Sequence, residues 1–240
     1  MNFGNRPAIL VAMGEELAPF LENCTQIGLP YELGGIETIT AKLGTKEMVL
    51  VRTGIGLVNA AIGATLALSR FGATGLISAG SAGGMGEGVQ VGDVVIGTEA
   101  LFSTADATAF TDYQVGQIPN LPARFRSPAH GKLPKADLAE ERVHQGLIIS
   151  GDAFVWERNF QAMSKLFPDA LAADMETAAI AQVAYRFEAP WLAVRGISDL
   201  CGPVAADDFI MHIDNAAALS AQVVMELLGK GFLGSGTRAR

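Results

Sequence analysis

Short apolar segments alternate along this chain with segments whose apolar residues recur at helical spacing. AILVAM at 8–13 precedes Gly14 and the helix-like EELAPFLENC, and KEMVLVR at 46–52 precedes TGIG and then LVNAAIGATLALS. Apolar runs of this length predict buried strands, and the segments between them predict helices. The repeated order predicts an α/β protein, folded as a three-layer α/β/α sandwich with helices on both faces of a central sheet.

The remaining segments continue this alternation, with one interruption. Strands are predicted in TGLISA before a Gly/Ser/Ala turn at 80–84, in VQVGDVVIGTEALF as one or two strands, in GLIISG, in LAAD and in PWLAVRGIS; helices are predicted in PKADLAEERVHQ, METAAIAQVAYRF and AAALSAQVVMELLGK. Residues 103–133 are irregular and proline-containing, and such a stretch in a compact domain is usually functional or packs on a partner. We expect one domain over 1–230 and a frayed tail over 231–240.

Composition excludes several classes of function. Half of the residues are hydrophobic, and 17 Lys and Arg against 25 Asp and Glu give a formal net charge of −8. Such an acidic chain is a poor candidate for binding nucleic acid, because neutralising phosphates requires a basic surface. The apolar run at 8–13 is too short for a signal peptide or a membrane span, which indicates a cytoplasmic protein that does not bind a membrane.

The cysteines and histidines do not form the spacings that metal sites use. Cys24 and Cys201 stand alone, without CxxC spacing, and are interpreted as free thiols in a reducing compartment. His130, His144 and His212 are scattered along the chain, with no HxxxH or HExxH pattern. We therefore expect neither a metal nor another cofactor.

Acidic side chains recur where the predicted strands end. In open α/β sheets, ligands bind just beyond the carboxyl ends of the strands. The residues found there are Met13, Glu15 and Glu16 after the first strand, Ile55 after the second, Ser81 after the third, and then Asp152, Phe154, Asp174, Met175, Glu176, Ser198 and Asp199 after the later ones. Carboxylates are rarely buried without a partner, so these acids are candidates for a functional site.

Some of these acids have a simpler structural interpretation. Glu15 in the first turn of a helix complements the helix dipole, and Asp174 and Asp152 are favoured as cap or turn residues. Asp199 could pair with Arg195 in the same strand, whereas Glu176 has no obvious partner nearby in the sequence. Met and Phe at such positions are more often core than ligand walls. Glu176 is therefore the acid that most requires a functional explanation.

Six motifs, in this order and spacing, resemble one enzyme superfamily. They are AMGEE, TGIGLVNAA, SAGSAGGM with VGDVV, SGDAF, ADMETAAIA and VRGISD, spread over about residues 8–228. They are similar to the nucleoside phosphorylase/nucleosidase superfamily and, within it, to bacterial 5'-methylthioadenosine/S-adenosylhomocysteine nucleosidases. The resemblance implies a homodimer of single-domain sandwiches around a mixed, partly barrel-like sheet. It also implies irreversible hydrolysis of the bond between adenine and a 5'-thio-substituted ribose.

The resemblance also implies a role for each matched residue. Glu16 would orient and activate the attacking water, Glu176 would bind ribose hydroxyls, and Asp199 would protonate adenine N7. Such an arrangement suits the chemistry, because adenine leaves poorly as an anion and the sugar becomes oxocarbenium-like. Burial should raise the pKa of Asp199, which must carry a proton when it acts.

The expected substrate-binding residues surround these three acids. They are Met175 beneath the sugar, Phe154 and Val155 at adenine, Ser81 near the water, Ser198 beside Asp199, Met13 and Ile55 at strand ends, and Phe110 and Pro119 in a segment that in the family reaches across the dimer. The aromatic residue expected over the 5' group has no clear match, and Phe209 is the nearest candidate. Ala107 replaces a commoner valine, which would leave more room there.

Three alternatives to this nucleosidase remain at this point. Phosphorylases of this fold carry arginines at strand ends, whereas this chain has ISAGSAGG and the acidic MGEE; Arg52 and Arg195 could still serve an anion. A hydrolase of a bulkier adenosine derivative, such as aminodeoxyfutalosine, would suit the room left by Ala107. A nucleoside-binding module without catalysis is disfavoured, because binding alone would not need Glu16, Glu176 and Asp199 together.

Overall fold

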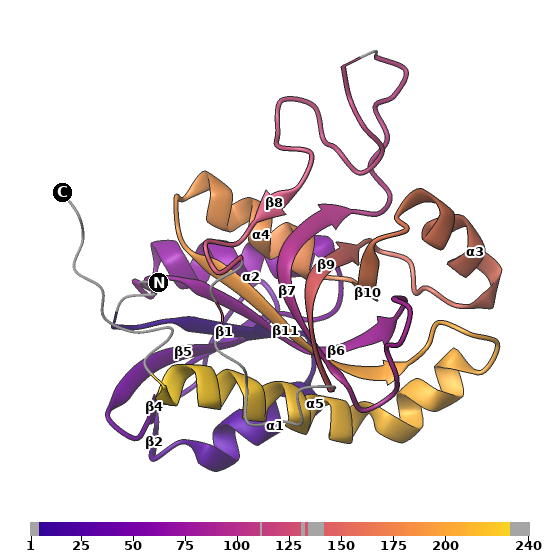
Figure 1. The fold of residues 1–240 in the computed structure, drawn as a ribbon. Coiled ribbons are helices and arrows are strands. Elements are labelled where there is room, and N and C mark those ends of the chain that lie inside the picture. The colour runs from indigo at the N-terminus through magenta and orange to yellow at the C-terminus, as the bar shows by residue number, and fades with distance from the viewer. Residues whose placement is uncertain (1–4, 111, 131–132, 134–141, 231–240) are drawn as a thin grey trace.

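The computed structural model of the chain describes residues 5–110, 112–130, 133 and 142–230, and its strands form one mixed sheet (Figure 1). The predicted tail over 231–240 and most of the helix predicted in PKADLAEERVHQ lie outside these residues. Four neighbouring strands are mutually parallel at the centre of the sheet, in the order β5 (Lys46–Arg52), β1 (Ala8–Val11), β6 (Leu76–Gly84) and β11 (Trp191–Asp199).

One half of the sheet closes on itself. Beyond β11 the sheet continues with β7 (Val94–Phe102), β9 (Val143–Ser150) and β10 (Ala170–Asp174), of which β7 is antiparallel to β11. β10 then pairs back onto β6, with Ala172 opposite Gly84 and Ala173 opposite Gly83. This ring of strands confirms the expected partly barrel-like sheet, and it brings the carboxyl ends of β6, β9, β10 and β11 close together.

The other half of the sheet ends in an open edge that the sequence analysis did not predict. β4 (Ile36–Leu43) is antiparallel to β5, and the short strands β2 (Gln26–Ile27) and β3 (Tyr31–Leu33) pair with β4. A last short strand, β8 (Phe125–Arg126), pairs with β7. The alternation of β-branched and polar residues in IETITAKL is the sequence signal for β4.

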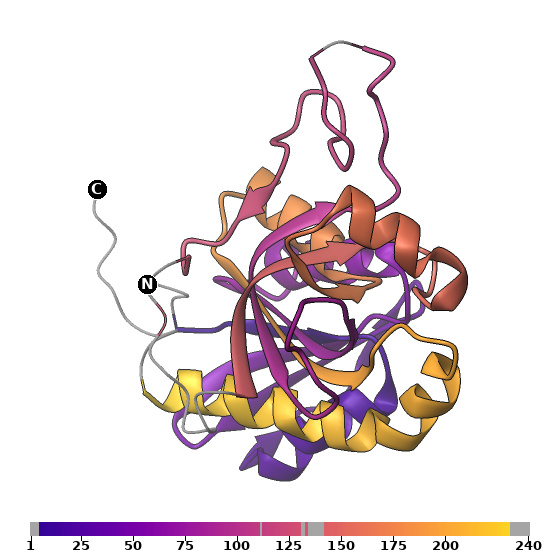
Figure 2. The same cartoon turned by 45° about the vertical axis from the view of Figure 1, so that its right-hand side comes forward.

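Helices cover both faces of the sheet, as the alternation predicts. α1 (Gly14–Asn23) and the long α5 (Ala205–Gly229) pack together on one face, and α2 (Leu57–Ser69) and α4 (Thr177–Arg186) pack together on the other. α3 (Glu157–Leu166) lies at the side of the closed ring (Figure 2). In the part of the chain that the structure describes, no helix is long and apolar enough to span a bilayer.

Two local predictions were wrong. Gly80 to Gly84 form the second half of β6, because this glycine-rich stretch must lie close to β10, β11 and the side chains packed behind them. Residues 143–145 of the predicted helix begin strand β9. VQVGDVVIGTEALF contains one strand, β7, in agreement with the predicted one or two. The irregular segment between β7 and β8 projects from the body of the molecule (Figure 2).

Candidate active site

A cavity of about 380 Å³ lies where the carboxyl ends of the strands meet. It is lined by all the predicted site residues except Phe110 and Pro119, namely Glu16, Glu176, Asp199, Met13, Ile55, Ser81, Phe154, Val155, Met175 and Ser198. A cavity of this size with few polar groups on apolar walls is typical of small-molecule sites. The sequence therefore located the cavity, although the roles assigned to its residues remain predictions.

The two missing residues lie in the projecting segment. Phe110 is 66% exposed and makes an edge-to-face contact with Tyr113, at 6.5 Å between ring centroids. Pro119 is also exposed. Neither lines the cavity of this chain, so their assignment to the site of a second protomer stays a prediction.

Glu16 is held rigidly at the floor of the cavity, although it is a carboxylate in a helix that packs on the core. Its Oε1 accepts hydrogen bonds from the Ser81 N–H at 2.8 Å and the Ser81 hydroxyl at 3.0 Å. Its Oε2 accepts from the Ala12 N–H at 2.8 Å and the Met13 N–H at 3.2 Å. Both oxygens are therefore oriented by the ends of β1 and β6.

The approach of Glu16 to β6 requires glycine at position 80. Gly80 has φ +140°, and a Cβ at this position would lie 2.3 Å from Glu16 Oε1 and 2.9 Å from Nη1 of Arg195. Any side chain would therefore displace both charged groups. This explains one glycine of the SAGSAGG run in terms of the site.

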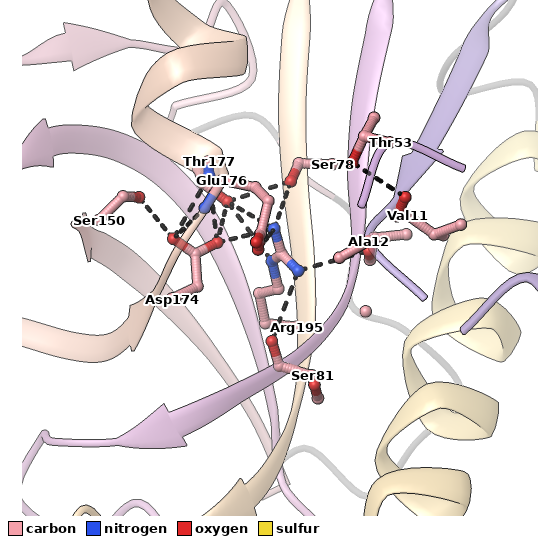
Figure 3. Close-up of polar contacts among 12 residues, drawn as sticks. Val11, Ala12, Thr53, Ser78, Ser81, Ser150, Asp174, Glu176, Thr177 and Arg195 are labelled. Carbon is pink, nitrogen blue, oxygen red and sulfur yellow. Dashed lines mark hydrogen bonds and ion pairs between the residues drawn. The ribbon is translucent and has the colours of Figure 1, made fainter. Parts of the chain in front are cut away.

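Glu176 has two partners, both distant in the sequence. Its Oε1 accepts a hydrogen bond from the Gly56 N–H at 2.9 Å, and its Oε2 lies 3.5 Å from Nη2 of Arg195. The same arginine nitrogen lies 2.7 Å from Asp174 Oδ2 and donates to the Ser78 hydroxyl at 2.6 Å. Figure 3 shows the guanidinium of Arg195 in contact with both acids.

Asp174 combines the predicted capping role with an ion pair. It accepts a hydrogen bond from the N–H of Thr177, the first residue of α4, at 3.2 Å, and it also accepts from the Thr177 and Ser150 hydroxyls. Two acids and one arginine thus share a buried network (Figure 3), which explains how the run LAADMETAAIA accommodates carboxylates.

The environment of Glu176 makes its ionised form costly. Burial raises the pKa of Glu176 from its usual value near 4.5 to about 7, and the neighbouring charges of Asp174 and Glu16 act in the same direction. Arg195 and the Gly56 N–H oppose this shift. Near neutral pH this carboxyl group therefore changes between its protonated and ionised forms.

Asp199 is as deeply buried as Glu176 but has different neighbours. Its Oδ1 accepts a hydrogen bond from the Cys201 N–H at 2.9 Å, and its Oδ2 accepts from the Ser198 hydroxyl at 3.0 Å. Burial raises the pKa of Asp199, the two hydrogen bonds oppose the shift, and the charge of Asp208 adds to it. Among the described residues no cation pairs with Asp199.

The pairing of Asp199 with Arg195 that the sequence suggested is wrong. Both residues lie in β11, and residues four apart in a strand are separated by about 13 Å. Arg195 instead points to Asp174 and Glu176, and Arg52 pairs with Glu37 at 2.8 Å, so neither arginine lines the cavity.

Several lining residues were not predicted from the sequence as site residues. They are Ala12, Ala82, Gly83, Ala153, Ala173, Asp174, Cys201, Ala206, Phe209 and Ile210. Phe209, noted above only as the nearest aromatic candidate, makes an edge-to-face contact with Phe154 at 6.1 Å between ring centroids. Burial raises the pKa of the Cys201 thiol well above its usual range, so it remains neutral beside Asp199. No cluster of potential metal ligands occurs within the described residues.

Comparison with known proteins gives consistent matches over nearly the whole chain. The sequence model described as the phosphorylase superfamily matches residues 6–229. The 5'-methylthioadenosine/S-adenosylhomocysteine nucleosidase of Listeria monocytogenes is 39% identical over 229 residues, which cover 92% of this chain and 97% of the relative. The nucleosidase of the same name from Aeromonas salmonicida is 38% identical, with 92% and 98% covered.

Solved structures agree with these sequence matches. The 5'-methylthioadenosine/S-adenosylhomocysteine nucleosidase of Neisseria meningitidis, in complex with methylthio-immucillin-A, aligns with a TM-score of 0.85 and 36% identity, covering 94% of this chain and 99% of that one. The futalosine hydrolase of Helicobacter pylori aligns with a TM-score of 0.86 but only 26% identity, with 94% and 98% covered. From this evidence the chain belongs to the phosphorylase superfamily and, within it, to the family of 5'-methylthioadenosine/S-adenosylhomocysteine nucleosidases.

Proposed function

We propose that this protein hydrolyses the N-glycosidic bond of 5'-methylthioadenosine and S-adenosylhomocysteine, releasing adenine and the 5-thio-substituted ribose. The observation that carries the proposal is the convergence of Glu16, Glu176 and Asp199 on one cavity, each in a different environment. The names of the relatives support the same reaction.

Asp199 is the proton donor to adenine in this proposal. Protonation at N7 turns a poor anionic leaving group into a neutral one, and a donor must hold its proton until the bond breaks. Burial raises the pKa of Asp199 and so favours the protonated form. The Ser198 hydroxyl can accept a hydrogen bond from the acid or donate one to the carboxylate, so it can follow the proton transfer.

Glu176 binds the ribose in the proposal. An ionised carboxylate accepts hydrogen bonds from two sugar hydroxyls and stabilises the positive charge that develops on the ring. The Gly56 N–H and Arg195 fix its two oxygens, and Met175 in the same turn contributes an apolar surface to the cavity. Sugar binding requires the ionised form, so it depends on the pKa of about 7 of this group.

Glu16 orients the attacking water. Its Oε1 accepts from both the N–H and the hydroxyl of Ser81. The N–H is fixed by β6, whereas the hydroxyl can rotate and leave one acceptor position to a water molecule. A carboxylate held by backbone donors at the cavity floor is then positioned to accept a proton from that water.

Water, not phosphate, is the nucleophile in this proposal. Every charged residue that lines the cavity is a carboxylate, Glu16, Asp174, Glu176 or Asp199, and like charges oppose the entry of a phosphate anion. Arg195 lies behind two of these acids, which neutralise it. This arrangement disfavours a phosphorylase.

The remaining walls suit an adenosine whose 5' carbon bears an apolar thioether. We assign Phe154 and Val155 to the adenine, and Met13, Ile55 and Phe209 to the apolar walls around the ribose and its substituent. Ser81 and Ser198 then act through the carboxylates that they contact.

The proposal includes a homodimer in a reducing, cytoplasmic compartment. Two observations support it: Phe110 is a large apolar side chain exposed on a projecting segment, and Cys24 and Cys201 are both free. Phe110 and Pro119 would cover the 5' group in the site of the other protomer. Light scattering of the purified protein tests this part, and a monomer at micromolar concentration would contradict it.

The experiment that tests the reaction is adenine release in phosphate-free buffer. We would compare 5'-methylthioadenosine, S-adenosylhomocysteine and aminodeoxyfutalosine as substrates, with and without added phosphate. We expect turnover of the first two without phosphate. Adenine release that requires phosphate and yields a ribose 1-phosphate would establish a phosphorylase. Turnover of aminodeoxyfutalosine alone would instead identify the protein as a hydrolase of that nucleoside.

A further inference from the structure

Helix α2 begins without a cap of its own. Its N-cap residue is Gly56, which has no side chain, and its first turn contains no acidic residue. The first N–H groups of a helix need acceptors, and the helix dipole favours negative charge there. Two carboxylates from other parts of the chain supply both the hydrogen-bond acceptors and the negative charge.

The two carboxylates bind successive N–H groups at this helix end. The Gly56 N–H donates to Glu176 Oε1 at 2.9 Å, and the Leu57 N–H donates to Asp152 Oδ1 at 2.7 Å. Glu176 follows β10 and Asp152 follows β9. The start of α2 therefore connects two loops that end neighbouring strands of the closed ring.

The loop that carries Asp152 continues directly into the wall of the cavity. Ala153, Phe154 and Val155 line the cavity, whereas Asp152 does not. Asp152 is exposed, and its carboxylate contacts the start of α2 and not the cavity.

The loop at Asp152 and the start of α2 lie so close together that each limits the conformation of the other. Gly56 has φ +108°, and a Cβ at this position would lie 2.9 Å from Asp152 Oδ1. The turn thus admits the carboxylate only because residue 56 is glycine. A small change in the position of Asp152 would move the Gly56 N–H that orients Glu176.

We propose that Asp152 is a positioning residue that fixes the adenine-side loop 153–155 relative to Glu176 through the shared N-terminus of α2. This inference rests on the proposed function for its kinetic consequence, but its geometric part is independent of that function. Displacements of about 1 Å between reacting groups cost an enzyme up to about a hundredfold in rate.

Three variants test this proposal. Asp152→Ala removes the acceptor, Asp152→Asn retains an acceptor that caps helices about as well, and Ala61→Gly weakens α2 by a similar amount away from the loop. Ala61 does not line the cavity. We expect kcat/KM for 5'-methylthioadenosine to fall about tenfold or more in Asp152→Ala, and less than about threefold in the other two variants.

Hydrogen exchange gives a readout that does not depend on activity. In Asp152→Ala we expect faster exchange at the amides of Gly56 and of residues 153–155, whereas Ala61→Gly should leave residues 153–155 unchanged. The proposal is overturned if Asp152→Ala and Ala61→Gly lower the melting temperature equally and also have the same kcat/KM and the same exchange rates at residues 153–155. Asp152 would then be only a helix cap. Absence of adenine release from the wild type would instead refute the proposed function, and the exchange data would still decide the role of Asp152.

Discussion

Two buried carboxyl groups that line the cavity, Glu176 and Asp199, have different surroundings. Glu176, on the side of α2 and α4, shares Arg195 with Asp174 and accepts a hydrogen bond from Gly56. Asp199, at the end of β11, has two neutral hydrogen-bond donors and, within the described residues, no cation. Burial raises the pKa of both groups, but only Glu176 has a positive charge that opposes the shift.

The difference separates the two functions that the reaction requires. Asp199, whose pKa is raised by burial, suits an acid, whereas Glu176, whose ionised form is stabilised by Arg195 and the Gly56 N–H, suits the binding of sugar hydroxyls. The fold achieves this with Arg195, which points away from Asp199 although both lie in β11. Substitutions can therefore test the surroundings of Asp199 and of Glu176 separately.

The largest effect is expected for Asp199→Asn. The amide can still accept the Cys201 N–H but cannot protonate adenine, so kcat should fall by about a thousandfold with little change in melting temperature. Measurement of adenine release under saturating substrate tests this expectation. Retention of more than about a tenth of the wild-type kcat would show that another group is the acid.

The next largest effect is expected for Arg195→Met, which removes the cation from the Glu176 side. Asp174 and Glu176 would then be buried without a counter-charge, which should lower the free energy of unfolding by about 3–5 kcal/mol in urea titrations. The matched control is Arg52→Met, which breaks only the more exposed pair with Glu37 and should cost less than about 1 kcal/mol. Equal losses in the two variants would contradict the role of the network.

Glu176→Gln should stabilise the protein at high pH. Below about pH 4.5 the carboxyl is protonated in both the folded and unfolded chains, and as the pH rises through about 7 its burial as an anion becomes fully unfavourable. The variant should therefore gain up to about 3 kcal/mol at pH 8 and almost nothing near pH 4.5. Melting temperatures measured across this range test the sign; a gain that grows as the pH falls would refute it.

The smallest effects are expected from the same substitution at two serines, each of which contacts a different carboxylate. Ser81→Ala removes one donor to Glu16 and should lower kcat about tenfold without moving the alkaline limb of the pH profile. Ser198→Ala removes a hydrogen bond that holds down the pKa of Asp199, so it should move that limb to higher pH. Identical profiles for the two variants would contradict the separation of roles.

The sequence located the site well because strand ends can be recognised locally. The apolar runs before Glu16, Met175 and Ser198 indicate where three strands end, and ends of neighbouring strands meet in space. The family resemblance added which acids belong together. The pairing of strands β6 and β10, which closes the ring, has no local signal and became visible only in the structure.

The errors have the same origin. The glycines of SAGSAGG indicate a turn locally, but they form strand because Gly80 must admit Glu16 and Gly83 lies against Cys201 and Asp199. Nearness in sequence suggested that Arg195 could pair with Asp199, whereas its actual partners come from β10 and the start of α4. Tertiary contacts of this kind are not encoded in spacing along the chain.

The most direct test is the pH dependence of kcat/KM for 5'-methylthioadenosine, measured in phosphate-free buffer from about pH 4 to about pH 10. We expect a bell-shaped profile, which rises as Glu176 ionises and falls as Asp199 loses its proton. A rate that stays constant or continues to rise at high pH would show that the reaction needs no protonated acid, and would contradict the division of roles between Asp199 and Glu176.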